Sequence, residues 1–181
     1  MSGPHLTPEQ FQTVYPQIAA WIRQTLIDHL SQAKTVATAG FSRLPLYFSG
    51  KHLATSNFVV VDQVPVPPLT SMGLSQFADF EAGSYAGITY LDTFFVRRDC
   101  VADEGLYFHE LIHVVQWQLL GPERFVAMYA DGLDKFGYRD SPLEVIAYNA
   151  EMLFRKPPAK PFNAETLVAE QLKLIPSSQA K

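Results

Sequence analysis

The spacing of apolar residues divides the chain into a helical start, a middle with strand character and a helical second half. Apolar residues recur at helical spacing from about Thr7 to Ala33. Thr7-Pro8-Glu9-Gln10 supplies the N-cap, the proline and the third-position glutamine of a capping box. Pro16 lies inside this segment, so we expect it to kink or split the helix.

The middle of the chain predicts short strands, because its apolar runs are rich in β-branched and aromatic residues. These runs are 44–48, 57–61 and 87–96, and a proline-rich extended connector occupies 64–68. Further helices are predicted at 104–120, 122–135, 141–155 and 165–174. A first helix and small sheet followed by a helical half predict an α+β fold.

The length and composition fit one globular domain. The chain has 181 residues and is 48% apolar, so we assign a single domain to 1–181. Its core would span 85–155, and 156–181 would form a proline-rich C-terminal tail. The formal net charge of −4 argues against a nucleic-acid partner.

The sequence also bears on compartment and on the type of metal site. Cys100 is the single cysteine, which excludes an intrachain disulfide and a cysteine-based zinc site. Residues 1–10 lack the features of a signal peptide, and no apolar run is long enough for a membrane span. We expect a soluble, cytoplasmic protein, with export by a route without a cleaved signal as the alternative. The oligomeric state is not determined by the sequence.

One motif carries most of the functional prediction, His109-Glu110-Leu111-Ile112-His113. On a helix, His109 and His113 lie on one face and can bind one Zn²⁺, while Glu110 can act as general base toward a water molecule. The helix is apolar on nearly every side, so we expect it to be buried. The competing interpretation is two core histidines that bond to their neighbours, with Glu110 exposed.

Catalytic zinc usually has three protein ligands. Positions 116 and 119 are Gln116 and Leu119, so no third histidine follows closely. A carboxylate on the helix predicted at 141–155 is the better candidate, either Glu144 or Glu151. The glutamate that is not a ligand would form a helix salt bridge or support a metal ligand from behind, and Glu151 has Arg155 at i, i+4 spacing for such a salt bridge.

These residues resemble the gluzincins, zinc metallopeptidases with H-E-x-x-H on one helix and a glutamate on a later one. Glu144-Val145-Ile146-Ala147 is similar to their third-ligand helix, which favours Glu144 as the third metal ligand. A group of small bacterial metallopeptidase domains is more similar still, sharing a strand, His-Glu-Leu-x-His-Val-Val-Gln and a Pro-Leu-Glu segment. The resemblance covers about 85–151 and implies a zincin-like domain.

One position departs from the thermolysin-like pattern. Four residues after the third ligand, those enzymes have an aspartate that orients a zinc-binding histidine, whereas this chain has Tyr148. A metal-bound histidine still needs a partner for its second ring nitrogen. Asn149, Asp140 or a backbone carbonyl are the alternatives.

The resulting hypothesis is a zinc metallopeptidase acting on a peptide or protein, with Glu110 as general base. Tyr138, Arg139 and Tyr148 are candidate donors to the oxyanion. The resemblance implies that substrate pairs with an edge strand, here 87–96. The substrate-binding residues would be Thr89, Tyr90, Leu91 and Asp92.

Two other functions compete with the peptidase. One is a catalytically silent metallopeptidase-like domain for binding or assembly. The other is a zinc hydrolase of a non-peptide amide, for which we expect a closed pocket instead of a long open cleft.

Overall fold

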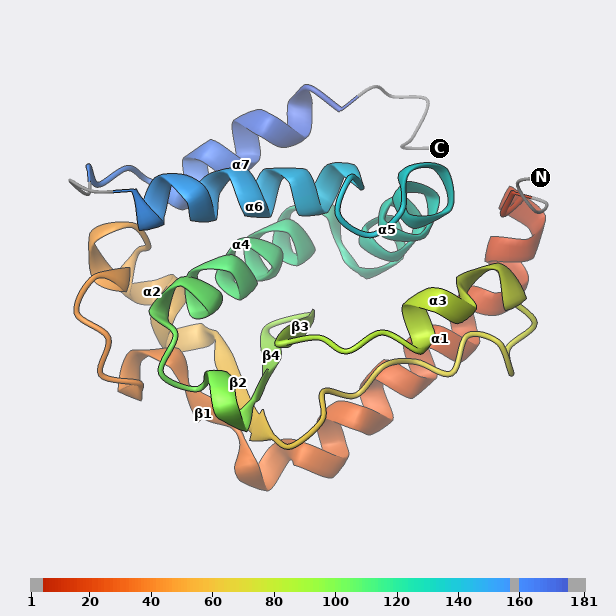
Figure 1. Cartoon of the computed structure of the whole chain (residues 1–181), viewed down its shortest axis with the longest axis horizontal. Coiled ribbons are helices and arrows are strands. Elements are labelled where there is room, and N and C mark those ends of the chain that lie inside the picture. Colours follow the sequence, from red (N-terminus) through yellow and green to blue (C-terminus); the bar gives the residue numbers. More distant parts are fainter. Residues whose placement is uncertain (1–4, 157–159, 176–181) are drawn as a thin grey trace.

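In the computed structural model of the chain, the helix that carries the H-E-x-x-H motif lies at the centre of the fold (Figure 1). This helix, α4 (Glu104–Leu120), is buried along most of its length, from Tyr107 to Trp117. The small sheet lies on one side of α4, and α6 (Pro142–Arg155) and α7 (Ala164–Lys173) lie on the other. The structure describes residues 5–156 and 160–175.

The sheet of the described residues has four strands in the order β1-β2-β4-β3. The strands are β1 (Lys34–Thr35), β2 (Asn57–Val61), β3 (Gly87–Tyr90) and β4 (Thr93–Arg97). β2 pairs with β4 in parallel, and the other two pairs are antiparallel. β3 is therefore an edge strand, and it lies next to α4.

Alternating residues of the strands supply two apolar clusters, one on each face of the sheet. Phe58 and Phe94 pack with α4 and α6 residues, whereas Val59 and Phe95 pack with residues of α1 (Pro8–His29). The chain also forms α2 (Gly50–Thr55), α3 (Ala78–Glu81) and α5 (Pro122–Phe136). The prediction of an α+β fold is confirmed, and the described residues form a single domain.

The helix predictions agree closely with the structure. Those made for 104–120, 122–135, 141–155 and 165–174 correspond to α4, α5, α6 and α7. The capping box at Thr7 and Gln10 is present at the start of α1. Pro16 does not split this helix, because only one backbone hydrogen bond is lost there and apolar residues on both sides, such as Val14 and Ile18, pack into the core.

The strand prediction for 44–48 is wrong. Residues Leu44–Leu46 form a 3-10 helix, since Pro45 fixes its backbone at a value that suits a tight turn. Tyr47 and Phe48 are both buried, and their rings contact Phe108 of α4. Consecutive buried residues do not alternate between two faces of a sheet, so the apolar content of this segment reflects a packed turn.

The single strand predicted for 87–96 is also wrong, because the segment is a hairpin. β3 and β4 are joined by Leu91 and Asp92, and Leu91 has a φ of 58°. A positive φ reverses the chain tightly in two-residue hairpin turns, although leucine rarely adopts it. The turn leaves Leu91 half-buried and Asp92 exposed, away from the paired residues.

The segment predicted as a C-terminal tail contains a helix that packs on the core. Ala164 and Val168 of α7 are fully buried against the core that contains α4. Parts of the predicted tail, 157–159 and 176–181, lie outside the described residues, as does 1–4. Across the part of the chain that the structure describes, each helix is too short or too polar to cross a bilayer.

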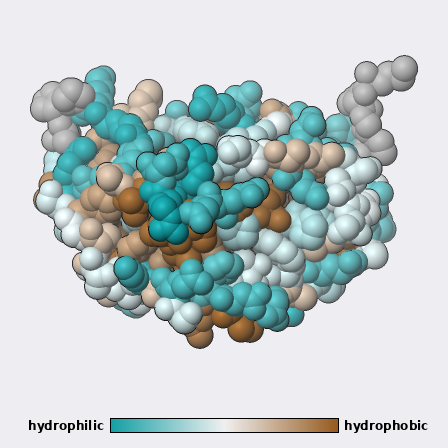
Figure 2. All heavy atoms as spheres, turned by 60° about the horizontal axis from the view of Figure 1, so that its bottom comes forward, coloured by the Kyte–Doolittle hydropathy of each residue, from teal (hydrophilic) through white to brown (hydrophobic). Residues whose placement is uncertain are grey.

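The surface turned forward in Figure 2, on the α1 side of the molecule, carries apolar side chains near its centre and lower edge. Hydrophilic residues interrupt them. Ile27 and Leu30, near the end of α1, are the most exposed large apolar residues of this helix. The apolar surface on this face is thus divided into patches.

Phe154 of α6 tests how strongly the central helix depends on its packing. Its ring stacks on Phe108 of α4 with centroids 4.5 Å apart, and 1% of the residue is exposed. Phe154→Ala should lower the free energy of unfolding by about 3–5 kcal/mol, since it leaves a cavity in the core. Phe136→Ala is the control because Phe136 is 48% exposed, and it should cost less than about 1 kcal/mol. Denaturant unfolding measures both; equal losses would contradict the packing described here.

Candidate metal centre

The ends of α4 are fixed by local interactions, and these set the position of the motif. The Asp103 carboxylate accepts hydrogen bonds from the backbone N–H groups of Gly105 and Leu106 at the N-terminus. Arg155 of α6 donates two hydrogen bonds to the same carboxylate, at 2.8 and 2.9 Å. Gly121 ends the helix with a φ of 77°. The central turns then place His109 and His113 on the face that contacts α6.

Three ligand-type atoms from two helices converge at this face. The Nε2 atoms of His109 and His113 are 3.1 Å apart. Oε2 of Glu144, in the first turn of α6, lies 3.3 Å from the first and 3.5 Å from the second. Ligands at 2.0–2.1 Å from a tetrahedral zinc ion would be about 3.3 Å apart. The spacing therefore fits an ion of this kind, and the three residues are close enough to bind a metal ion.

The other ring nitrogens determine which form the imidazoles take. Nδ1 of His109 lies 3.0 Å from a carboxylate oxygen of Glu151, and Nδ1 of His113 lies 2.8 Å from Oε1 of Gln116. The Gln116 amide is oriented because its nitrogen donates to the carbonyl of Leu143. Both partners are acceptors, so each Nδ1 carries the proton and each Nε2 of a neutral ring presents a lone pair to the centre.

Glu144 is held in position by a residue of another helix. Its Oε1 accepts a 2.6 Å hydrogen bond from the hydroxyl of Tyr129 in α5. Its Oε2 is buried and has no hydrogen-bond partner among the described residues. Ser141, the N-cap of α6, makes no side-chain cap hydrogen bond, and the Glu144 carboxylate lies next to the histidines instead of the helix end. An unpartnered buried carboxylate oxygen is costly unless a cation lies beside it.

The electrostatics of the cluster favour positive charge. Burial alone would lower the pKa of His109, but carboxylates, chiefly those of Glu144 and Glu151, raise it to about 10. Burial alone would raise the pKa of Glu144, but the two imidazoles hold it well below its usual range. Without a metal ion, His109 therefore carries a second proton beside the ionised Glu144. A divalent cation that displaces this proton would supply the positive charge in its place.

Glu110 points from α4 toward the edge strand. Its side chain is buried, and its Oε2 accepts a 2.6 Å hydrogen bond from the hydroxyl of Thr89 in β3. A Cβ atom at Gly87 would come within 2.4 Å of the Glu110 carboxylate, so only glycine allows this approach. Burial raises the pKa of Glu110, which suits a group that must both accept and release a proton.

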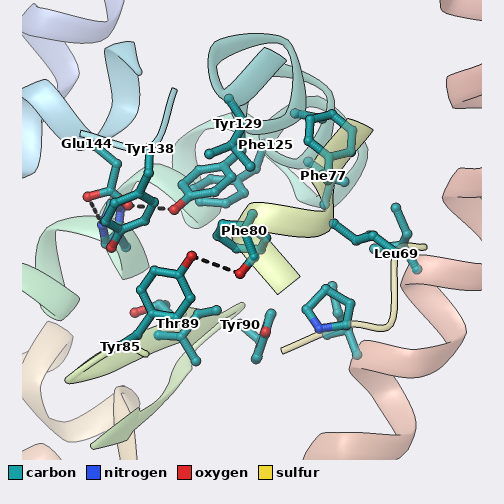
Figure 3. A pocket seen from close by; sticks show the side chains of 18 of the residues that line it. Leu69, Phe77, Phe80, Tyr85, Thr89, Tyr90, Phe125, Tyr129, Tyr138 and Glu144 are labelled. Carbon is teal, nitrogen blue, oxygen red and sulfur yellow. Dashed lines mark hydrogen bonds and ion pairs between the residues drawn. The ribbon is translucent and has the colours of Figure 1, made fainter. Parts of the chain in front are cut away.

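A cavity of about 90 Å³ adjoins the cluster. Glu110, His113 and Glu144 line one end of it, and most of the remaining lining is apolar or aromatic. In Figure 3, Tyr138 lies beside Glu144, and Tyr85 lies below them. Burial and the Glu144 carboxylate raise the pKa of Tyr138, so its phenol stays protonated and able to donate a hydrogen bond.

The structure separates the other candidate residues. Tyr148 is half-buried with its ring 4.6 Å from that of His109, and Arg139 is exposed and lies over Tyr148. Neither lines the cavity, unlike Tyr138. Among the proposed substrate-binding residues, Thr89 and Tyr90 are buried and line the cavity, whereas Leu91 and Asp92 form the hairpin turn.

Of the residues that orient the cluster, the sequence indicated only Glu151, as the glutamate that is not a metal ligand. The partners of the histidines are Glu151 and Gln116, not Asn149 or Asp140, both of which are exposed. Gln116 is three residues after His113, so helical spacing was a usable signal for it. Tyr129 gave no signal, because its hydroxyl reaches Glu144 only through the packing of α5 on α6.

Comparisons with family models, with curated proteins and with solved structures give no match for this chain. The resemblance to gluzincins therefore rests on the motif residues alone.

The two glutamates of α6 should differ in their effect on metal affinity. Glu144→Ala removes one of three converging ligand atoms and should weaken zinc binding by more than about 100-fold. Glu151→Ala removes only the partner of the His109 Nδ1–H group and should cost about 10- to 100-fold. Titration of each purified variant against a competing zinc chelator measures both. A larger loss for Glu151→Ala would show that Glu151 is the ligand.

Proposed function

We propose that this chain is a zinc-dependent hydrolase of amide bonds, a metallopeptidase in its catalytic design. The observation that carries the proposal is the shared cavity of Glu110, His113 and Glu144, in which a buried acid adjoins three converging ligand atoms. Two histidines and one carboxylate with tetrahedral spacing favour zinc over magnesium or calcium, which prefer more oxygen ligands. Three protein ligands leave a fourth position for water or substrate.

Zinc bound at this cluster would polarise the substrate carbonyl and lower the pKa of a water molecule toward neutrality. Glu110 would take the proton of the attacking water and deliver it to the leaving nitrogen. Thr89 fixes the Glu110 carboxylate through its hydroxyl. Tyr138 is the proposed donor to the oxyanion, since it lines the cavity and keeps its phenolic proton.

The alternative of a silent binding domain is less well supported by these contacts. A structural metal site is usually closed by four protein ligands and has no use for a general base. Here three ligand-type side chains converge among the described residues, and an acid lies next to them in a cavity. This arrangement is typical of a catalytic site.

Replacement of the proposed general base separates catalysis from metal binding. Glu110→Gln should retain one zinc per chain and should lower kcat/KM by about 10²- to 10⁴-fold, because the amide cannot accept a proton. Elemental analysis and a chelator-sensitive digest of a peptide and amide library measure the two properties. Glu170→Gln, at an exposed position of α7, is the control and should leave both unchanged. Full activity in Glu110→Gln would eliminate this role for Glu110.

Thr89 should act as a positioning residue for Glu110. Thr89→Val keeps the side-chain shape but removes the hydroxyl, so we expect kcat to fall about tenfold with zinc content unchanged. Thr89→Ser keeps the hydroxyl and should retain most of the activity. Steady-state kinetics on the substrate found for the wild type give the comparison. Equal kcat values for the Val and Ser variants would rule out a contribution of the hydrogen bond.

A further inference from the structure

The cavity beside the metal cluster changes character along its length. Its polar end is formed by Glu110, His113 and Glu144, and it then passes between aromatic side chains of the sheet edge, the 67–80 segment and α5. In Figure 3, Phe125 and Phe77 lie between Glu144 and the far end, which is marked by Leu69. Beyond them the lining is aliphatic and includes Ile18, Ile22, Leu74 and Leu133. A ligand that reaches the cluster through this space contacts mainly hydrocarbon.

The edge strand offers little room for a peptide main chain. In the antiparallel β3–β4 pair, backbone groups of alternate residues point away from β4. The Thr89 carbonyl is one of these, and it accepts a hydrogen bond from the indole N–H of Trp117 at 3.2 Å. The backbone of Gly87 lies directly against Glu110. A peptide that added to β3 would therefore find the Thr89 acceptor already engaged, so recognition by strand pairing is restricted.

The size of the cavity limits its ligand. A cavity of about 150 Å³ holds one benzene molecule, so about 90 Å³ has room for roughly three to four carbon atoms and not for an aromatic ring. This space is too narrow for a folded protein segment and too apolar to be filled favourably by water. A hydrocarbon chain would fill it and gain roughly 0.8 kcal/mol for each buried methylene, about a fourfold gain in affinity.

We infer that this cavity binds a linear apolar chain of about three to four carbon atoms next to the scissile bond, so that the preferred substrates are amides carrying a short acyl chain. The inference rests on the proposed hydrolase function for the scissile bond, and on the lining and volume of the cavity for the chain. The carbonyl of such an amide lies at the polar end, between Glu110 and the ligand cluster. Its hydrocarbon extends from there along the apolar lining toward Phe125.

A series of linear acyl hydroxamates tests the inference without requiring turnover. The hydroxamate group binds zinc, and the length of the acyl chain probes the size of the cavity. We expect calorimetry on the zinc-loaded full chain to show affinity rising about three- to fourfold per methylene from two carbons to about four to five, counting the carbonyl carbon. The affinity should then level off. Benzyl-substituted and branched hydroxamates of equal carbon count should bind more weakly than the linear one.

Two alanines of α5 give matched variants. Ala130 lines the cavity and Ala127 does not. Ala130→Phe should abolish the increase with chain length while two-carbon hydroxamate binds as in the wild type, and Ala127→Phe should keep the increase. Leu133→Trp provides a second obstruction of the cavity if Ala130→Phe does not fold, as judged by circular dichroism.

The outcomes distinguish this inference from the proposed function. Affinity that does not change with chain length, or absence of binding at every length, overturns the inference whether or not the chain hydrolyses amides. Stronger binding of the benzyl compounds would show that the cavity prefers an aromatic group to a linear acyl chain. This result would also overturn the inference. A clear length dependence without any amide turnover would support the cavity and refute the hydrolase.

Discussion

Two imidazole nitrogens and one carboxylate oxygen face each other at the centre of this protein, within 3.1 to 3.5 Å. The two imidazoles direct their Nδ1–H groups to Glu151 and Gln116, so their Nε2 atoms face the Glu144 oxygen. Burying such a set without positive charge would cost several kcal/mol. This requirement for positive charge is met either by a second proton on His109 or by a cation between the three atoms.

Helix α6 packs on α4 and contributes side chains to the cluster from two places along its length. Glu144 at the start of α6 supplies the ligand oxygen, and Glu151 two turns later orients His109. Arg155 then connects Glu151 to Asp103, the N-cap of α4. The ends of both helices are thus tied to the same polar network that holds the imidazoles. Close packing at Gly105 is part of this, since a Cβ there would meet the guanidinium of Arg155.

The position of the cluster at the edge of the sheet explains the rest of the proposed site. The sheet ends at β3, so the space beyond that strand is filled by α5, the 67–80 segment and part of α1. These elements contribute side chains that are largely apolar and leave a cavity whose polar end is the metal cluster. Thr89 belongs to both parts, because it lines the cavity and holds Glu110. The candidate metal centre and the apolar cavity therefore share one strand edge.

The sequence by itself determined the α+β class, the positions of the long helices and the candidate ligands His109 and His113, because helical periodicity, caps and i, i+4 spacing are local properties. Two strand predictions were wrong, since local composition does not distinguish a buried turn such as 44–48, or a hairpin such as 87–96, from a single strand. The third candidate ligand, Glu144, required a resemblance to choose it over Glu151. Only the tertiary structure decided that Gln116, Glu151 and Tyr129 orient the cluster, and that Thr89 contacts Glu110. Most of these contacts join segments far apart in the chain, and their partners are selected by how helices and strands pack, which no local pattern encodes.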